Sequence, residues 1–161
     1  IRDSSQTRRY AGIMDALSEA NVPVSNVRQI DYHTVFGSPV PSTSSYKSYE
    51  ELFFPVDYTA VIGFNDLQSY SAMEILKERG YRIPEDISLI SFDHLRKTHT
   101  YLPPLTSIAD NTDKSIADTA VSILLDKIKN SDSKFTGAVL PVTIYDGHTT
   151  GPVNKAFETS F

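Results

Sequence analysis

The chain has 161 residues, which is enough for one domain or for one part of a larger domain, and enough to bury a substantial core. With 40% hydrophobic and 22% charged residues it is typical of a globular protein, and no apolar run reaches the roughly 18 residues of a membrane span. The lack of Cys excludes disulfides, zinc–thiolate sites and thiol nucleophiles, and the net charge of −5 argues against a segment that binds nucleic-acid phosphates by itself.

The first third of the chain predicts a helix, a strand and a second helical segment. Apolar side chains at helical spacing predict a helix over Arg9–Ala20, and the short run Val27–Asp31 predicts a strand. Phe36–Ser45 is polar and rich in Gly, Pro and Ser, which is typical of a loop. Apolar residues then return at helical spacing between Tyr46 and Phe53, before a proline that ends the segment.

The middle of the chain predicts two more strands around a helix. Ala60–Phe64 is a continuous apolar run, the pattern of a strand covered on both faces. Asp66 is expected to cap a helix over Leu67–Arg79, which Gly80 ends. Ile87–Phe92 predicts the third strand.

The last third predicts a long helix and a final strand. After the break at Pro103 and Pro104, apolar residues in register predict a helix over Asn111–Asn130. A loop follows, then a strand over Val139–Tyr145 and a tail over Gly147–Phe161. Strands that alternate with helices predict an α/β fold with right-handed crossovers and a doubly wound parallel sheet.

Polar side chains stand at the ends of the first three predicted strands, where ligands bind in such sheets. They are Tyr32, Asn65 and Asp93. An aromatic ring can stack on the apolar face of a sugar or base, while Asn and Asp bracket hydroxyl groups as donor and acceptor. Arg9, at the start of the first helix, could add a charge-assisted donor from the same side.

Each of these residues has a plainer interpretation when it is taken alone. Asn or Asp at a strand end commonly caps the next helix, Tyr32 could pack in a small satellite core, and Arg9 could lie solvated on its helix. The coincidence of three strand ends is what favours a binding site.

Several segments in a fixed order carry a resemblance to a known family: Arg9-x-Ala11-Gly12, Asp31-Tyr32, Ala60–Asp66, Gly80–Asp93 and Pro103–Ile108. From about Thr7 to Thr150 the chain resembles the effector-binding domain of the LacI/GalR family of bacterial transcriptional regulators, which has a periplasmic-binding-protein-like fold. Two stretches depart from the family pattern. Ser91-Phe92-Asp93-His94 stands where the family usually has Gly-aromatic-Asp-Asp, so the backbone is less permissive there, although Asp93 is kept. Gly147-His148-Thr149-Thr150 lacks the Arg that the family often carries there.

The resemblance implies a sensor of a small molecule, a sugar or sometimes a nucleobase, with Arg9, Tyr32, Asn65 and Asp93 as effector contacts. It also implies a cytoplasmic homodimer, in which Tyr70 and Tyr101 lie at the dimer interface. No cofactor is implied. For Tyr70 the sequence leaves a second interpretation open, in which this side chain simply closes the core.

The resemblance also divides the chain. Residues 1–108 would form the C-terminal lobe of a two-lobed domain, residues 109–146 would return to the N-terminal lobe, and residues 147–161 would form a tail. The resemblance implies that an N-terminal lobe and a DNA-binding headpiece precede this part, which agrees with the acidic charge and with a chain that opens at Ile1 and not at Met. Without that lobe, Asn111–Tyr145 is expected to pack poorly on its own chain.

Other functions have less support. The sequence has neither the nucleophile elbow of a hydrolase nor a glycine-rich nucleotide loop, and its four His lack metal-ligand spacing, so we expect no enzyme and no metal site. The serious alternative is a periplasmic or extracellular sugar-binding protein of a transport system, which shares the fold. Gly80–Asp93 and Pro103–Ile108 resemble the regulators more closely.

Overall fold

The computed structural model describes residues 4–30, 51–95, 103–110, 115–130 and 137–154. In chain order, the helices and strands are α1 (Ser4–Glu19), the 3-10 turn η1 (Val24–Asn26), β1 (Ala60–Ile62), α4 (Asp66–Glu78), β2 (Ser88–Phe92), β3 (Thr106–Asp110), α5 (Ile116–Lys129) and β4 (Val142–Tyr145). None of these helices is both long and apolar enough to cross a membrane.

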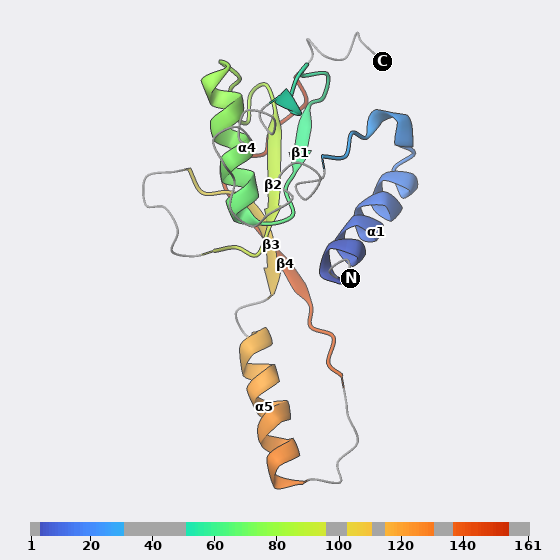
Figure 1. The fold of residues 1–161 in the computed structure, drawn as a ribbon, viewed down its shortest axis with the longest axis vertical. Helices are drawn as coiled ribbons and strands as arrows, with labels where there is room; N and C mark the ends of the chain where they lie inside the picture. Colours follow the sequence, from blue (N-terminus) through green and yellow to red (C-terminus); the bar gives the residue numbers. More distant parts are fainter. Residues whose placement is uncertain (1–3, 31–50, 96–102, 111–114, 131–136, 155–161) are drawn as a thin grey trace.

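The strands form one sheet in the order β1-β2-β3-β4. β1, β2 and β3 are parallel, as predicted, whereas β4 runs antiparallel to β3. The reason is the position of α5, which stands beyond the end of the sheet and does not cover either face (Figure 1). The chain therefore re-enters the sheet at the end where it left, and Asp110 pairs with Val142.

The core lies between α4 and the sheet, while α1 stands on the other side (Figure 1). Met73, Ile75 and Leu76 of α4 and Leu89 of β2 are fully buried. Each such side chain contributes about 1.5–3 kcal/mol relative to its exposed state. This packing fixes the position of α4 beneath β2.

The ends of α4 follow from local chemistry. Its N-cap is Asn65, whose Oδ1 accepts a hydrogen bond from the Gln68 amide, so the prediction that Asp66 caps this helix is wrong. At the other end Gly80 has a φ of 87°, and the amide of Tyr81 donates to the Leu76 carbonyl. This is the glycine-terminated helix end that the sequence predicts.

Two strand predictions differ from the structure, and one strand of the structure was not predicted. Val27–Ile30, the described part of the first predicted strand, has no regular secondary structure. β1 is not covered on both faces, since Ala60 and Ile62, which share one face of the strand, are both exposed. β3, which follows the two prolines, was not predicted as a strand. The predicted loop over Phe36–Ser45 and most of the predicted helix up to Phe53 lie outside the described residues.

Helix α5 packs on none of the other described elements. Ser115 caps it by accepting a hydrogen bond from the Asp118 amide. None of its residues is buried, and Figure 1 shows it apart from the sheet. Its apolar side chains are largely exposed: Ile116, Val121, Leu124, Leu125 and Ile128. The expectation that Asn111–Tyr145 packs poorly on its own chain agrees with α5 but is wrong for β4, which pairs with β3.

The segment after β4 is anchored to the sheet through residue 154. Thr149 is fully buried, its hydroxyl donates to the Leu89 carbonyl at 2.7 Å, and it accepts from the Thr106 amide at 2.9 Å. Gly151 exchanges hydrogen bonds with Ser88. Thr149 and Gly151 are thus bonded to the sheet, and the proposed domain boundaries, with a tail over residues 147–161, stay a prediction.

Candidate functional site

Two of the predicted contact residues, Arg9 and Asp93, form an ion pair. Arg9 reaches from α1 to the carboxyl end of β2, where its Nη2 lies 2.7 Å from Asp93 Oδ1. Its Nη1 donates to the Phe64 carbonyl, just after β1. The two side chains are 31% and 39% exposed, so both remain accessible to a ligand. The structure thus brings together residues 84 positions apart.

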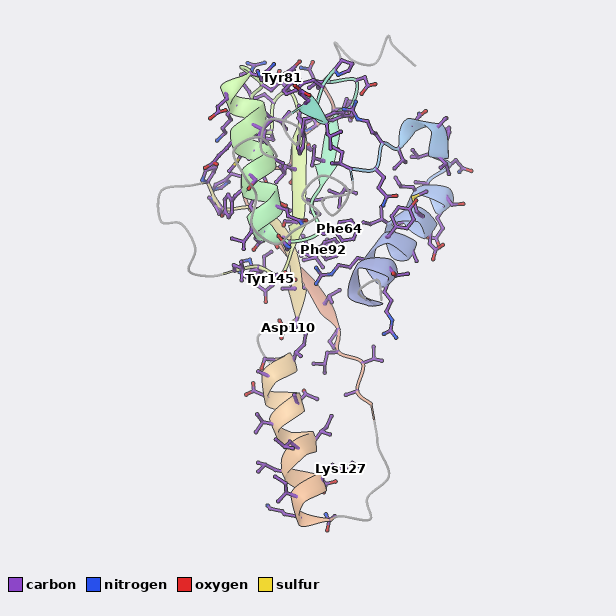
Figure 2. All side chains as sticks on the ribbon, in the orientation of Figure 1. Phe64, Tyr81, Phe92, Asp110, Lys127 and Tyr145 are labelled. Carbon is purple, nitrogen blue, oxygen red and sulfur yellow. The ribbon has the colours of Figure 1, made fainter. Side chains whose placement is uncertain are left out.

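An aromatic ring supports this ion pair. The Arg9 guanidinium carbon lies 4.9 Å from the centroid of the Phe92 ring, within the range of a cation–π contact. Figure 2 shows Phe64 and Phe92 at the same end of the strands, next to α1. Sequence reasoning missed Phe92. The alternation of β2 could have indicated it, because Leu89 and Ser91 are buried beneath α4 and Phe92 therefore faces the other side.

Asn65 precedes α4 at the same end of the sheet. Its side-chain oxygen is used to cap the helix, which is the plainer of the two interpretations of this residue. Among the described residues, none accepts a hydrogen bond from the Asn65 amide nitrogen, so that nitrogen can still donate to a ligand.

The backbone after β2 turns through the left-handed region at two successive residues. Asp93 has a φ of 95° and His94 a φ of 45°. Asp and His are among the non-glycine residues most often found there. The Asp93 amide donates to the Ile108 carbonyl, and the His94 amide donates to Ser107 Oγ. These bonds tie the turn to β3.

The remaining predicted contacts are less well placed. Tyr32 and Tyr101 lie outside the described residues. Tyr70 is partly buried on α4 and packs against the core cluster. Burial raises the pKa of the Tyr70 phenol, and the negative charge of Asp66 raises it further. These observations agree with a Tyr70 that closes the core, while its role at a dimer interface stays a prediction.

An open cavity of about 380 Å³ lies between α1 and β1. Its walls are mainly apolar, with Ile13 and Leu17 from α1 and Val61 from β1. Arg9 and Asp93 do not line it. Phe64 lines the cavity, and its carbonyl accepts a hydrogen bond from Arg9, so the cavity and the ion pair are adjacent but distinct.

The described residues contain no group of three His, Asp or Glu side chains that could hold a metal ion. What the site offers is a carboxylate, a guanidinium and a carboxamide. These groups pair with hydroxyls and with the polar edge of a base, and they supply no nucleophile paired with a general base.

Comparison with known proteins supports a binding role. Residues 2–150 match a family described as a periplasmic binding protein-like domain. The HTH-type transcriptional repressor PurR of Mannheimia succiniciproducens is 30% identical over 128 residues, which cover 79% of this chain and 36% of that protein. PurR of Aliivibrio salmonicida is 37% identical over 123 residues, covering 76% and 35%. The chain thus spans about a third of the length of these relatives, which are repressors and not enzymes.

Solved structures show the same fold. A LacI family transcriptional regulator from Enterococcus faecium with bound ribose has a TM-score of 0.72 at 24% identity, covering 91% of this chain and 52% of that one. A LacI-type transcription regulator from Bifidobacterium animalis subsp. lactis has a TM-score of 0.70 at 25% identity, covering 94% and 52%. The transcriptional regulator CelR in complex with cellobiose has a TM-score of 0.66 at 22% identity, covering 89% and 42%.

Proposed function

Because the chain belongs to the family of periplasmic binding protein-like domains, in the form found in LacI/GalR-type regulators, we propose that it is the ligand-sensing and dimerisation part of a bacterial transcriptional repressor. In this proposal it binds a small effector, a sugar, in the cytoplasm. The bound effector controls how an N-terminal headpiece outside this chain binds operator DNA. The homodimer contacts would include Tyr70 and Tyr101.

The observation that carries the proposal is the accessible Arg9–Asp93 pair at the carboxyl ends of parallel strands. Surface ion pairs stabilise a fold by only about 0–1 kcal/mol, so this one is poorly explained as a device for stability. A carboxylate that accepts from two hydroxyls, with a guanidinium and the Asn65 amide as donors, suits a polyhydroxylated ligand.

A sugar is favoured over a nucleobase by the ligands of the structural neighbours. One regulator of the same fold holds ribose and another holds cellobiose. A nucleobase remains the competing class, since its polar edge also pairs with a carboxylate and a guanidinium. Tyr32, the predicted stacking residue, would serve either class.

The effector would act by favouring one arrangement of the two lobes. A ligand shifts such an equilibrium only by its difference in affinity for the two states, typically about 1–3 kcal/mol. In this scheme the effector contacts supply that difference, and the lobes transmit it to the spacing of two paired headpieces.

The direct test is a thermal-shift screen on the longest natural polypeptide that contains this chain. The panel holds ribose, cellobiose, sugar phosphates and nucleobases. A ligand at a hundred times its Kd adds about 2.7 kcal/mol to the free energy of unfolding, which is an easily measured shift. We expect a sugar to give that shift in the natural protein, and Arg9→Ala and Asp93→Asn to lose most of it.

The matched control is Arg82→Ala. It removes another Arg–Asp ion pair, with an Arg82–Asp86 distance of 2.7 Å, which lies outside the proposed site. This variant should keep the full ligand shift. If a ligand raises the melting temperature equally in the natural protein, Arg9→Ala and Asp93→Asn, the assignment of these residues to the site is contradicted. If no compound of the panel raises it, the proposed sensor function is contradicted.

The transport alternative predicts a different upstream sequence. A helix-turn-helix headpiece encoded ahead of this chain supports the regulator, and a signal peptide supports the transport protein. The repressor names of the matched relatives favour the first outcome.

A further inference from the structure

We propose that Asp66 and Ser107 are positioning residues of the effector site, which hold the left-handed turn at Asp93–His94 so that the Asp93 carboxylate faces Arg9. The inference rests on the proposed function only in taking Asp93 as a ligand contact. Neither Asp66 nor Ser107 is itself a predicted contact.

The turn requires an external restraint. Two successive residues with side chains lie at positive φ, 95° at Asp93 and 45° at His94. In this region the Cβ crowds the backbone carbonyl, so the conformation is unfavourable without compensating contacts. The direction of the Asp93 carboxylate depends on this backbone, because Asp93 is itself one of the two residues.

Asp66 and Ser107 supply the restraint through a buried chain of hydrogen bonds. Asp66, the first residue of α4, is 3% exposed, and Ser107 of β3 is 1% exposed. The His94 amide donates to Ser107 Oγ at 3.0 Å, and Ser107 Oγ donates to Asp66 Oδ1 at 2.8 Å. The Leu95 amide donates to Asp66 Oδ2 at 2.5 Å. Two consecutive amides of the turn are thus fixed to two other elements.

A carboxylate suits this position better than an amide. Both oxygens of Asp66 accept hydrogen bonds here, whereas an Asn would have a single acceptor oxygen and would turn an N–H group toward a donor. Helix capping does not explain the buried charge, because Asn65 caps α4. The N-terminus of α4 favours a negative charge at this place, which lowers the cost of burying it.

The other side of the turn is held by a ring contact. The His94 ring stacks on Tyr145 of β4, with centroids 3.8 Å apart and planes at 9°. The Tyr145 hydroxyl in turn donates to the Asp110 carbonyl at 2.9 Å. His94 is therefore held by β3 and β4, while Asp93 pairs with Arg9 of α1.

Amide hydrogen exchange by NMR tests the restraint directly, since it follows the His94 and Leu95 amides one at a time. Ser107→Ala removes the acceptor of His94, and Asp66→Ala removes the acceptor of Leu95. We expect each variant to speed exchange at its own amide by at least about tenfold beyond any change in global stability. If Asp66→Ala does not fold, Ser107→Ala carries the test alone.

The matched control is Ser69→Ala on α4. Ser69 is fully buried, and its hydroxyl lies within hydrogen-bond distance of Ser91 Oγ at 2.8 Å and of the Asn65 carbonyl at 3.0 Å, but makes no bond to the turn. The Asn65 carbonyl keeps its bond from the Ser69 amide in this variant. This variant should lower the melting temperature while leaving exchange at His94 and Leu95 unchanged. Unchanged exchange at both amides in Ser107→Ala and Asp66→Ala would overturn the proposal, whatever the protein binds.

Ligand affinity provides the second measurement, with ribose as the probe and cellobiose in parallel. Ser107→Ala should weaken binding roughly tenfold, as expected for a misdirected carboxylate, while Ser69→Ala should not. Ser107→Thr, which keeps a hydroxyl that can accept from the His94 amide and donate to Asp66, should lose less affinity than Ser107→Ala. Equal losses in the two variants would indicate a general packing defect and not a loss of the hydrogen bonds.

The two proposals fail differently. Faster exchange in the variants, together with a natural protein that binds no compound of the panel, would support the restraint and contradict the effector function. Faster exchange with unchanged ribose affinity would contradict the positioning role.

Discussion

At the scale of single residues, the Arg9–Asp93 ion pair is the feature on which the proposed effector site rests. Both partners were proposed from the sequence, Asp93 because it follows a predicted strand and Arg9 because it was expected to open the first helix. The structure corrects the second reason, since α1 begins at Ser4 and Arg9 lies within it. Ser107 could not be found in this way. Its bond to Asp66, 41 positions away, and the burial of both side chains follow from the tertiary structure and leave no local pattern in the sequence. Phe92 lies between these cases, because strand alternation indicates its face but not its contact with Arg9.

Removing the pair should separate affinity from stability. We expect Asp93→Asn or Arg9→Ala to weaken effector binding roughly ten- to a hundredfold, since contacts to charged groups contribute about 1.5–3 kcal/mol. The pair is partly exposed, so the free energy of unfolding should change by less than about 1 kcal/mol. Calorimetric titration and urea denaturation measure the two quantities. A loss of stability as large as the loss of affinity would indicate a structural pair.

Asp86 should make stability depend on pH in the acid range. Hydrogen bonds from the Arg82 side chain and backbone lower the pKa of Asp86 to about 2, from its ordinary value near 4. The folded state therefore binds this proton less readily than the unfolded state, and the stabilisation is lost as the pH falls from about 4 to 2. Urea denaturation across this range should give a shallower pH dependence in Asp86→Asn. An identical slope in both proteins would contradict the assignment.

At the scale of elements, prediction succeeded where local chemistry sets the boundary and failed where pairing sets it. The end of α4 follows from Gly80, and its start was missed by one residue because Asn65 and Asp66 can both cap a helix. β3 has five residues, as β2 does, but it carries fewer large apolar side chains, so its own sequence does not indicate a strand. The run Val27–Ile30 has a strand-like sequence but no strand in the structure.

The join between β4 and the core depends on a glycine. A Cβ at Gly147 would lie 2.3 Å from the Pro104 carbonyl oxygen and 2.4 Å from the Leu105 carbonyl carbon, both backbone atoms that cannot move aside cheaply. Gly147→Ala should therefore cost about 1–3 kcal/mol of stability. Gly137→Ala, where a Cβ meets nothing within 4 Å, is the control and should be close to neutral. Thermal denaturation of both variants decides the point, and equal melting temperatures would contradict it.

At the scale of the whole molecule, the described residues form one packed unit, the sheet with α4, while α1 lies across the open cavity from β1 and α5 projects beyond the sheet. Figure 2 places Lys127 of α5 far from the labelled aromatic residues of the sheet. The sequence predicted this separation only through the family resemblance, because an apolar stripe alone cannot tell a covered helix from an uncovered one.

In this chain alone, without the N-terminal lobe to which residues 109–146 are expected to return, the exposed stripe of α5 should promote self-association. Leu124 is 59% and Ile128 69% exposed, so replacing both with Glu removes apolar surface without emptying a core. We expect the double variant to self-associate less in analytical ultracentrifugation, with an unchanged melting temperature. A lowered melting temperature would indicate that α5 packs on the sheet in solution.

The buried hydroxyl of Thr149 has a consequence for synthesis on the ribosome. Its bond to Leu89 joins residues 60 positions apart and connects the middle of the sheet to one of the last described segments. Helices α1 and α4 need only nearby residues and can form early, but the sheet gains this closing contact only after Thr149 has left the exit tunnel. Until then the Leu89 carbonyl of β2 and the Thr106 amide of β3 lack the hydrogen bonds that Thr149 provides. A chain that stalled before this residue would expose these groups to chaperones or to other nascent chains.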